Sequence, residues 1–271
     1  MDVNAYLRRV GYVGGLEPSL ATLRGLHRAH LLAIPYENLD IHLGRELSLD
    51  LSKIYQKLVI ERRGGWCFEM NGLFAWILGE LGFEVTMLSA AVNRHRAGDR
   101  AEGNHLTLLV MLDKPYLADV GFGDGMLEPL ILEEGKHLQG FLRYGLESRA
   151  DRWIFHNHQH GSAERFDFTL KPAKLSDFAD ACQHLQTSPD SGFVKVTVCQ
   201  RFTPQGITSL RGAVLTRITA AGISEQTIRS ADEYAHVLRR QFGLQIDAYE
   251  LWSEVWRSHV AWVKSVEGQK S

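Results

Sequence analysis

The chain has 271 residues, a formal net charge of −2 and an isoelectric point near 6.6. Hydrophobic residues make up 45% and charged residues 23%, as in an ordinary globular protein large enough for two or three packed subdomains. The near-neutral charge excludes a general attraction to nucleic acid or to an anionic membrane. No apolar run approaches the roughly 18 residues that span a bilayer, and the N-terminal segment lacks the apolar core of a signal peptide. We therefore expect a cytoplasmic protein.

The first 85 or so residues are predicted to be helical, with helices over residues 18–34 and 50–60 and Ser52 as a cap of the second. The glycines in residues 62–67 indicate a turn. Beyond it, apolar residues recur every three or four positions, which predicts an amphipathic helix that ends near Gly82. This stripe consists of Met70, Phe74, Ile77 and Leu81. Cys67 is therefore expected at or near the N-terminus of a helix.

Beyond residue 85 the pattern changes to short β-prone runs separated by polar or glycine-containing segments, which predicts an antiparallel, barrel-like region. The C-terminal part is predicted to hold strands over residues 207–218 and helices over 230–242 and 248–263. The runs assigned to the barrel are residues 85–92, 105–112, 116–122, 153–156, 164–170 and 193–201.

The three cysteines, Cys67, Cys182 and Cys199, form a sparse and odd-numbered set, which is a poor disulfide framework. A helix N-terminus favours the thiolate, and preceding glycines allow the sharp turn that brings a sulfur to a cleft. Cys67 has this context and is the candidate nucleophile, although a cysteine is more often a small buried apolar residue. The other two cysteines lack it and are expected only to pack.

A cysteine nucleophile needs a base, and the base needs an orienting partner. His105 begins the apolar run HLTLLVML, and Asp119 interrupts the next apolar run, where a carboxylate is costly to bury unless paired. In a hairpin symmetric about Lys114, the two side chains share a face but are offset by several residues. A bulge, a longer loop or a shifted register has to close the gap, and the sequence leaves all three open.

Four segments closely resemble the arylamine N-acetyltransferase family, in particular its bacterial members and the related N-hydroxyarylamine O-acetyltransferases. They are IPYENLD, RRGGWCFEMNGLF, the histidine before an apolar strand, and YLADVGFGDG, at residues 34–40, 62–74, 105 and 116–125. Residues 155–160 and 193–212 also look like bacterial members, so the resemblance covers nearly the whole chain. Tyr36 departs from the usual phenylalanine and Trp66 from a common tyrosine, but both keep an aromatic ring.

The resemblance implies an α+β fold on a core shared with papain-like cysteine enzymes. Residues 1–85 would form an N-terminal helical bundle carrying the nucleophile, 86–200 a central antiparallel β-barrel carrying the base and its partner, and 201–271 a C-terminal α/β lid. It also implies a catalytic triad of Cys67, His105 and Asp119. Such an acyltransferase passes an acetyl group from acetyl-coenzyme A through acetyl-cysteine to an arylamine, arylhydrazine or N-hydroxyarylamine, and serves xenobiotic metabolism.

The same resemblance nominates acceptor-binding residues Tyr36, Val92, Phe122 and Phe202, although aromatic residues in strands often belong to the core. Gly123 and Gly125 would let the backbone approach the coenzyme A donor. The Cys67 N–H would help to bind the developing oxyanion. Expected partners are coenzyme A and a small aromatic amine or hydrazine, without nucleic acid, membrane or metal. The oligomeric state stays open.

Other polar residues allow two interpretations each. His156, His158 and His160 alternate and in a strand would share a face, which suggests a metal site only weakly. Glu69 could act as a second acid or stabilise the helix N-terminus by its charge. Residues 37–38 are expected to buttress the site by hydrogen bonds.

Three rival functions use the same residues differently. An amide synthase or other acyltransferase on this scaffold would close a polyketide macrocycle, and a hydrolase or transglutaminase-like enzyme would act on peptides without coenzyme A. A non-catalytic binding module is disfavoured, because the three triad residues are all present.

Overall fold

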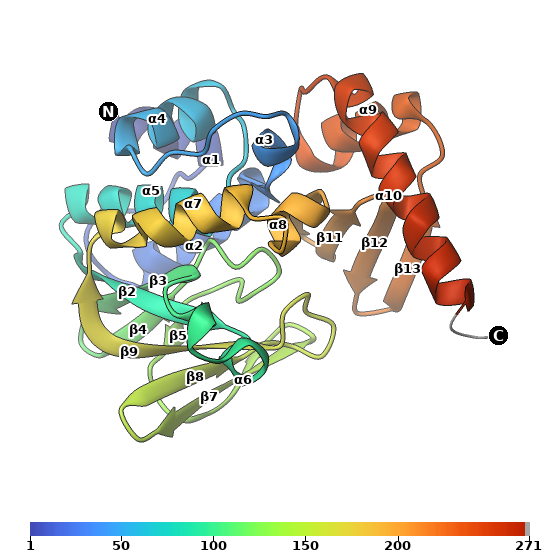
Figure 1. The fold of residues 1–271 in the computed structure, drawn as a ribbon. Helices are drawn as coiled ribbons and strands as arrows, with labels where there is room; N and C mark the ends of the chain where they lie inside the picture. The colour runs from blue at the N-terminus through green and yellow to red at the C-terminus, as the bar shows by residue number, and fades with distance from the viewer. Residues whose placement is uncertain (269–271) are drawn as a thin grey trace.

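Short helices dominate the first third of the chain in the computed structural model, which describes residues 1–268 (Figure 1). The Ser19 side chain accepts the Thr22 N–H and so caps α2, which ends before Pro35. Asp50, and not Ser52 as predicted, caps α4, because its carboxylate accepts two backbone N–H groups. The elements are α1 Val3–Val10, α2 Leu20–Ala33, β1 Tyr36–Glu37, α3 Leu39–His42, α4 Leu51–Tyr55 and a π-helical turn Gln56–Ile60.

Helix α5, Cys67–Glu80, is the central helix of this region. The predicted helix is present, with Met70, Phe74 and Ile77 buried, but Leu81 lies just past its end and the helix is not amphipathic as predicted. Gly82, at φ 84°, follows in the left-handed conformation that favours glycine. The helix is buried on nearly all sides, because it packs between the other N-terminal helices and strands β2 and β3. Cys67, its first residue, therefore lies inside the molecule where the helices meet the sheet.

An eight-stranded antiparallel sheet curls into the barrel-like region below these helices, in the order β5-β4-β3-β2-β9-β8-β7-β6 (Figure 1). Helix α6, Arg94–Ala97, and a 3₁₀ turn, Gly98–Ala101, precede β3. The strands are β2 Glu84–Val92, β3 His105–Met111, β4 Pro115–Ala118, β5 Leu130–Ile131, β6 Gly135–Gln139, β7 Leu142–Arg149, β8 Arg152–His156 and β9 Arg165–Ala173.

The register of the β3–β4 hairpin decides how the candidate base meets its partner. Leu108 pairs with Ala118 and Met111 with Pro115, so the hairpin is centred on Asp113 and not on Lys114. This shifted register closes much of the offset left by the sequence. The predicted strand over 116–122 is too long: β4 ends at Ala118, because the next backbone N–H groups bind side chains of the N-terminal helices.

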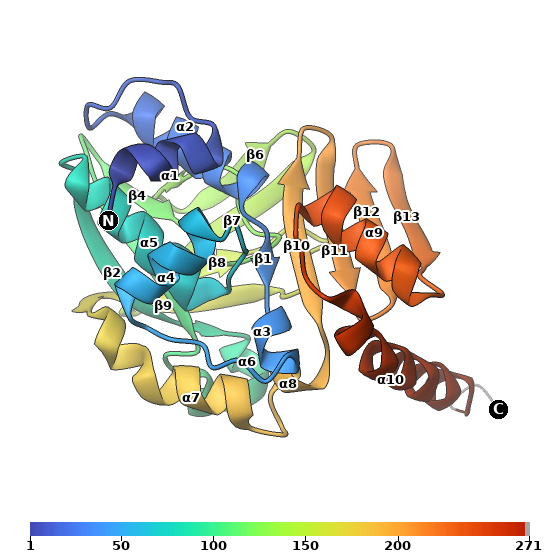
Figure 2. The ribbon, with the colours of Figure 1, turned by 90° about the horizontal axis from the view of Figure 1, so that it is seen from above.

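The C-terminal region forms a second sheet together with β1 of the N-terminal region, in the order β1-β10-β11-β12-β13, with α9 and α10 packed on it (Figure 2). The strand predicted over 193–201 is partly wrong. Ser191 caps the short helix α8, and β10 begins only at Val198. The elements are a 3₁₀ turn Leu175–Phe178, α7 Ala179–Thr187, α8 Gly192–Lys195, β10 Val198–Thr203, β11 Gly206–Arg211, β12 Val214–Thr219, β13 Gly222–Thr227, α9 Ala231–Phe242 and α10 Ala248–Gly268.

The predicted fold class, helical bundle, antiparallel barrel and α/β lid, is confirmed. The division at residues 85 and 200 stays a prediction. Among residues 1–268, every helix is too short or too polar to cross a membrane.

Candidate active site

Cys67 occupies the first position of α5, directly after the extended residue Trp66. Two glycines make this position possible. A Cβ on Gly64 would lie 2.2 Å from the Pro35 carbonyl oxygen, and one on Gly121 would lie 2.7 Å from the Cys67 Cα atom. The chain can therefore turn into the helix with a second loop pressed against its first residue. Only 2% of the Cys67 surface is exposed.

The thiol of Cys67 lies in surroundings that act on its charge in opposite directions. Burial raises its pKa well above the usual value, and the nearby Asp119 carboxylate adds to this effect. Backbone N–H groups of Phe68 and Leu106 face the sulfur and lower its pKa, but burial prevails. Without a base, the thiol would stay protonated at neutral pH.

His105 and Asp119 are in direct contact. The His105 Nε2–H donates to Asp119 Oδ2 at 2.6 Å, and both side chains are buried. The second carboxylate oxygen accepts the Asn71 amide at 2.8 Å and the Gly121 N–H at 2.9 Å. Burial alone would raise the Asp119 pKa, but His105 and these hydrogen bonds lower it below the usual value. Asp119 is thus an ionised acceptor in a fixed position.

Backbone contacts place the thiol beside the start of β3. The Cys67 Sγ lies 4.0 Å from the carbonyl oxygen of Asn104, and the Leu106 N–H faces the sulfur. His105 stands between these two residues. Since its Nε2 is bound to Asp119, Nδ1 is the ring nitrogen that remains for a second partner.

Aromatic side chains form one wall of the site. The Phe122 ring lies 5.2 Å from that of His105, and the Phe166 ring lies 5.1 Å from it. Phe166 also packs 4.8 Å from Phe155. Sequence reasoning named Phe122 and missed the other two. The alternating run RFDFTL in β9, which sends Phe166 and Phe168 to one face, was the signal available.

The other predicted acceptor-binding residues are Tyr36, Val92 and Phe202, and they have different surroundings. Tyr36 is close to the Phe122 loop, because a Cβ on Gly123 would lie 3.4 Å from its ring. Val92 is tied to the residue before His105 by the Asn104 side chain, which accepts its N–H at 2.8 Å. Phe202 lines a cavity of about 830 Å³ between the barrel and the lid, and the lining of that cavity does not include Cys67, His105 or Phe122.

Asp124, which sequence reasoning did not single out, anchors the glycine-rich loop. Its buried carboxylate accepts the Ser162 N–H at 2.7 Å and the Gln200 amide at 3.0 Å. Burial raises its pKa to about 6. Gly123 has φ 76°, and a Cβ there would lie 2.1 Å from Gln200 Oε1. Packing against Gln200 therefore requires glycine at this position, whether or not Gly123 also contacts coenzyme A.

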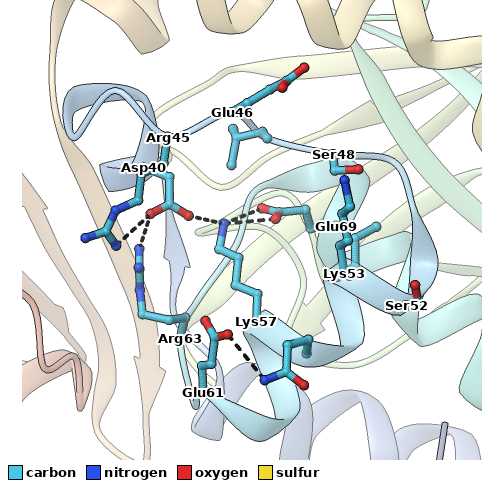
Figure 3. Close-up of a pocket in the computed structure, with 13 residues that line it drawn as sticks. Asp40, Arg45, Glu46, Ser48, Ser52, Lys53, Lys57, Glu61, Arg63 and Glu69 are labelled. Carbon is cyan, nitrogen blue, oxygen red and sulfur yellow. Dashed lines mark hydrogen bonds and ion pairs between the residues drawn. The ribbon is translucent and has the colours of Figure 1, made fainter.

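A network of buried ion pairs lies on the other side of the α5 N-terminus, and we call it the support network. Figure 3 shows its members Asp40, Lys57, Arg63 and Glu69. Glu69 accepts the Trp66 N–H at 3.2 Å, as expected of a carboxylate in the first turn, which favours the capping interpretation over a second acid. Lys57 lies 2.9 Å from Glu69 and 2.8 Å from Asp40. The network consists of Glu37, Asp40, Lys57, Arg63 and Glu69.

The Glu37–Asn38 segment joins this network to the lid. Glu37 accepts from Arg63 at 2.8 Å and from the Leu39 N–H at 2.7 Å. The Asn38 amide donates to the Val196 carbonyl and accepts the Val198 N–H. The segment supports the site at a distance.

The rings of the three alternating histidines contact different groups, although the His160 backbone N–H also donates to His158 Nδ1. His156 pairs with Glu147, the His158 ring contacts the Asp124 carbonyl, and the His160 ring contacts Gln159. In the part of the chain that the structure describes, no three histidine, cysteine, aspartate or glutamate side chains are grouped to hold a metal ion.

Comparisons with known proteins agree with this arrangement. A family model for N-acetyltransferases matches residues 19–251. The chain is 35% identical to the arylamine N-acetyltransferase pineal gland isozyme NAT-3 of Gallus gallus, over 91% of this chain and 95% of that protein. It is 35% identical to arylamine N-acetyltransferase 1 of Homo sapiens, over 80% and 83%.

Solved structures give the same result. The arylamine N-acetyltransferase of Mycobacterium marinum superposes with a TM-score of 0.86 at 30% identity, over 94% of this chain and 98% of that chain. The enzyme from Salmonella typhimurium gives the same four values. A further Mycobacterium marinum structure, at 28% identity and a TM-score of 0.86, is a complex with CoA.

The fold and the family match define an acetyltransferase. The chain belongs to the arylamine N-acetyltransferase family, as the sequence motifs predicted.

Proposed function

We propose that this enzyme transfers an acetyl group from acetyl-coenzyme A to arylamines, arylhydrazines or N-hydroxyarylamines through an acetyl-Cys67 intermediate. The observation that carries the proposal is the His105–Asp119 hydrogen bond of 2.6 Å next to a thiol at the start of a helix. The names of the relatives support the acceptor class, and the CoA complex of the Mycobacterium marinum enzyme supports the donor.

In the first half-reaction, the Cys67 proton moves to His105 Nδ1. Because burial disfavours a lone thiolate, the thiolate forms only as a pair with the imidazolium that Asp119 stabilises. The sulfur attacks the acetyl carbonyl, and backbone N–H groups at the helix start, including that of Cys67, stabilise the oxyanion. The C–S bond to coenzyme A breaks, and its sulfur takes the proton from His105.

In the second half-reaction, the acceptor nitrogen or oxygen attacks the acetyl-Cys67 carbonyl. His105 Nδ1 removes the proton of the attacking group, and Cys67 leaves and is reprotonated. Two easier transfers thus replace one difficult transfer. Phe122 and Tyr36 would hold the acceptor ring, with Val92 at the edge and Phe202, on β10, on the lid side. Gly123 and Gly125 would give the donor room to approach the backbone.

Mass spectrometry of the intact protein after mixing with acetyl-coenzyme A, without acceptor, tests the proposal. We expect one added acetyl group, absent from Cys67→Ala and removed when an arylamine is added. A folded wild-type protein that gains no acetyl group between about pH 6 and pH 9 would contradict the acetyl donor. It would favour another acyl donor or a peptide-directed cysteine enzyme.

A further inference from the structure

One imidazole binds both ends of the loop that carries Asp119 and Phe122. His27, on α2, is completely buried. Its Nε2 accepts the Asp119 N–H at 3.1 Å, and its Nδ1 lies 3.0 Å from the Leu127 carbonyl oxygen. The first and last residues of the segment 119–127 therefore both bind the His27 ring, which lies 92 positions before Asp119 in the sequence.

These two contacts fix the protonation of His27. A backbone N–H can only donate, so Nε2 must accept and carries no proton. A carbonyl oxygen can only accept, so Nδ1 must carry the proton. Only the neutral ring satisfies both ends, and burial lowers the pKa of His27 to about 4, which keeps it neutral. The ring is thus a donor and an acceptor of fixed direction.

The contact with Asp119 lies where β4 has ended and no strand partner is available to this N–H. His27 supplies the partner and so sets where the backbone of Asp119 leaves the sheet. The carboxylate of the same residue reaches His105 at 2.6 Å. A displacement of the backbone by a fraction of an ångström would lengthen that bond, because the side chain has only two rotatable bonds.

We propose that His27 is a positioning residue for acetyl transfer: its neutral ring clamps residues 119–127 so that Asp119 orients His105. His27 acts through Asp119 and does not touch the reacting atoms. The inference rests on the proposed function, in which Asp119 and His105 activate Cys67.

His30 provides a matched control one turn further along the same helix. It is also completely buried, and its ring packs edge-on against Phe74 at 5.6 Å, as that of His27 does at 5.8 Å. Its Nδ1 contacts the Tyr6 hydroxyl at 2.9 Å, on the side of α1. Replacing His30 therefore disturbs the same layer of the core without touching residues 119–127.

The test compares His27→Phe, His27→Gln and His30→Phe in the full chain. We measure thermal unfolding, the single-turnover release of coenzyme A, and the pH dependence of Cys67 alkylation by iodoacetamide. Both Phe variants should lose similar stability, but only His27→Phe should slow acetylation, by about 100-fold, and shift the alkylation midpoint upward. Gln should restore most of the rate, because its amide offers a donor and an acceptor at a spacing close to that of the ring nitrogens.

Equal rates and equal alkylation profiles in the two Phe variants would overturn the inference, since His27 would then only fill the core. If His27→Phe does not fold, His27→Asn replaces it, because Asn can reach Leu127 but not Asp119. A normal rate in that variant would equally overturn the role. Failure of the wild-type enzyme to form acetyl-Cys67 would instead contradict the proposed function. The alkylation profile needs no acetyl donor and tests His27 separately.

Discussion

Buried ionisable groups lie on both sides of the α5 N-terminus, but they are paired differently on the two sides. In the support network, Asp40 and Glu69 each lie within 2.9 Å of a lysine or arginine nitrogen. On the other side, Asp119 has His105, Asn71 and a backbone N–H as partners, and no lysine or arginine binds it in the described part of the chain.

The pKa directions follow this difference. Burial would lower the pKa of Lys57 and Arg63, but the surrounding carboxylates raise both, and the two cations lower that of Asp40. Glu69 is the exception, because its complete burial outweighs Lys57 and raises its pKa. Lys57, Arg63 and Asp40 therefore keep their charges over the working pH range. In the candidate triad the thiol pKa is raised and the only permanent charge is Asp119, so a proton can move between Cys67 and His105. The ion pairs of the support network fix the geometry of the helix start, whereas the candidate triad leaves a proton free to move.

Asp119→Asn breaks the candidate triad and should have the largest effect. The Asn amide can present N–H groups to His105 Nε2, which favours the ring tautomer with its proton on Nδ1, where it cannot accept the thiol proton. We expect the single-turnover acetylation rate to fall by roughly 10³- to 10⁴-fold. Rapid mixing with acetyl-coenzyme A measures it.

Asp99→Asn is the control, since the Asp99 side chain is fully exposed, and it should acetylate at the wild-type rate. A loss below tenfold in Asp119→Asn would show that His105 does not depend on Asp119 for its orientation.

Lys57→Met breaks the support network and should act first on stability. The substitution leaves the Asp40 and Glu69 carboxylates, only 8% and 3% exposed, without their shared cation. Removing one partner of a buried pair costs about 3–5 kcal/mol of unfolding free energy, measured by urea unfolding. Lys53→Met, at an exposed lysine of α4, should stay within about 0.5 kcal/mol.

The acetylation rate of Lys57→Met tests whether the support network and the candidate triad have separate roles. At temperatures where Lys57→Met is folded, its rate should fall much less than that of Asp119→Asn. An equal loss would mean that the support network takes part in the chemistry and that the two sides are not separate.

The contact between His105 and Asp119 could be anticipated from the sequence, whereas the groups that hold these side chains in place could not. The position of Cys67 follows from local signals, two glycines and an apolar stripe, and the pairing of His105 with Asp119 follows from a hairpin. The partners of Asp119 on α2 and α5 are 92 and 48 positions away, and no local pattern links them. No local pattern in the sequence links Lys57 to Asp40 and Glu69 either, because the contact forms only when the helices pack together.

In the barrel and the lid, too, the sequence pattern failed where an element depends on residues far away in the chain. The alternating runs predicted most strands, but the end of β4 depends on side chains from the helices. The helical turn at 192–195 depends on Ser191, and the Asn38 amide also binds the Phe193 carbonyl there. Tertiary hydrogen bonds override strand propensity at both places.

Asp124→Asn tests a carboxylate that has hydrogen bonds but no cation. Its native pKa of about 6 lies above the ordinary 3.8, so the folded state binds the proton more tightly. Stability from this group is therefore present at low pH and is lost as the pH rises through about 6, by about 3 kcal/mol in total. The variant should lack this loss, about half of which falls between pH 5 and pH 8.

Urea unfolding at several pH values measures the difference between Asp124→Asn and the wild type. A difference that does not change with pH would show that Asp124 titrates at an ordinary pKa, and that hydrogen bonds from Ser162 and Gln200 stabilise its charge as well as a cation would.

Cys182→Ala should have the smallest effect and separates burial from reactivity. Cys182 is 4% exposed, close to the 2% of Cys67, and burial raises its pKa to about 12. The Gln186 amide donates to its sulfur at 3.5 Å, and no imidazole binds this sulfur among residues 1–268. We expect an unchanged acetylation rate and a loss of about 1 kcal/mol from the smaller side chain. Since both thiols are buried, a large loss of acetylation in a stably folded Cys182→Ala would mean that the histidine–aspartate pair does not select the nucleophile.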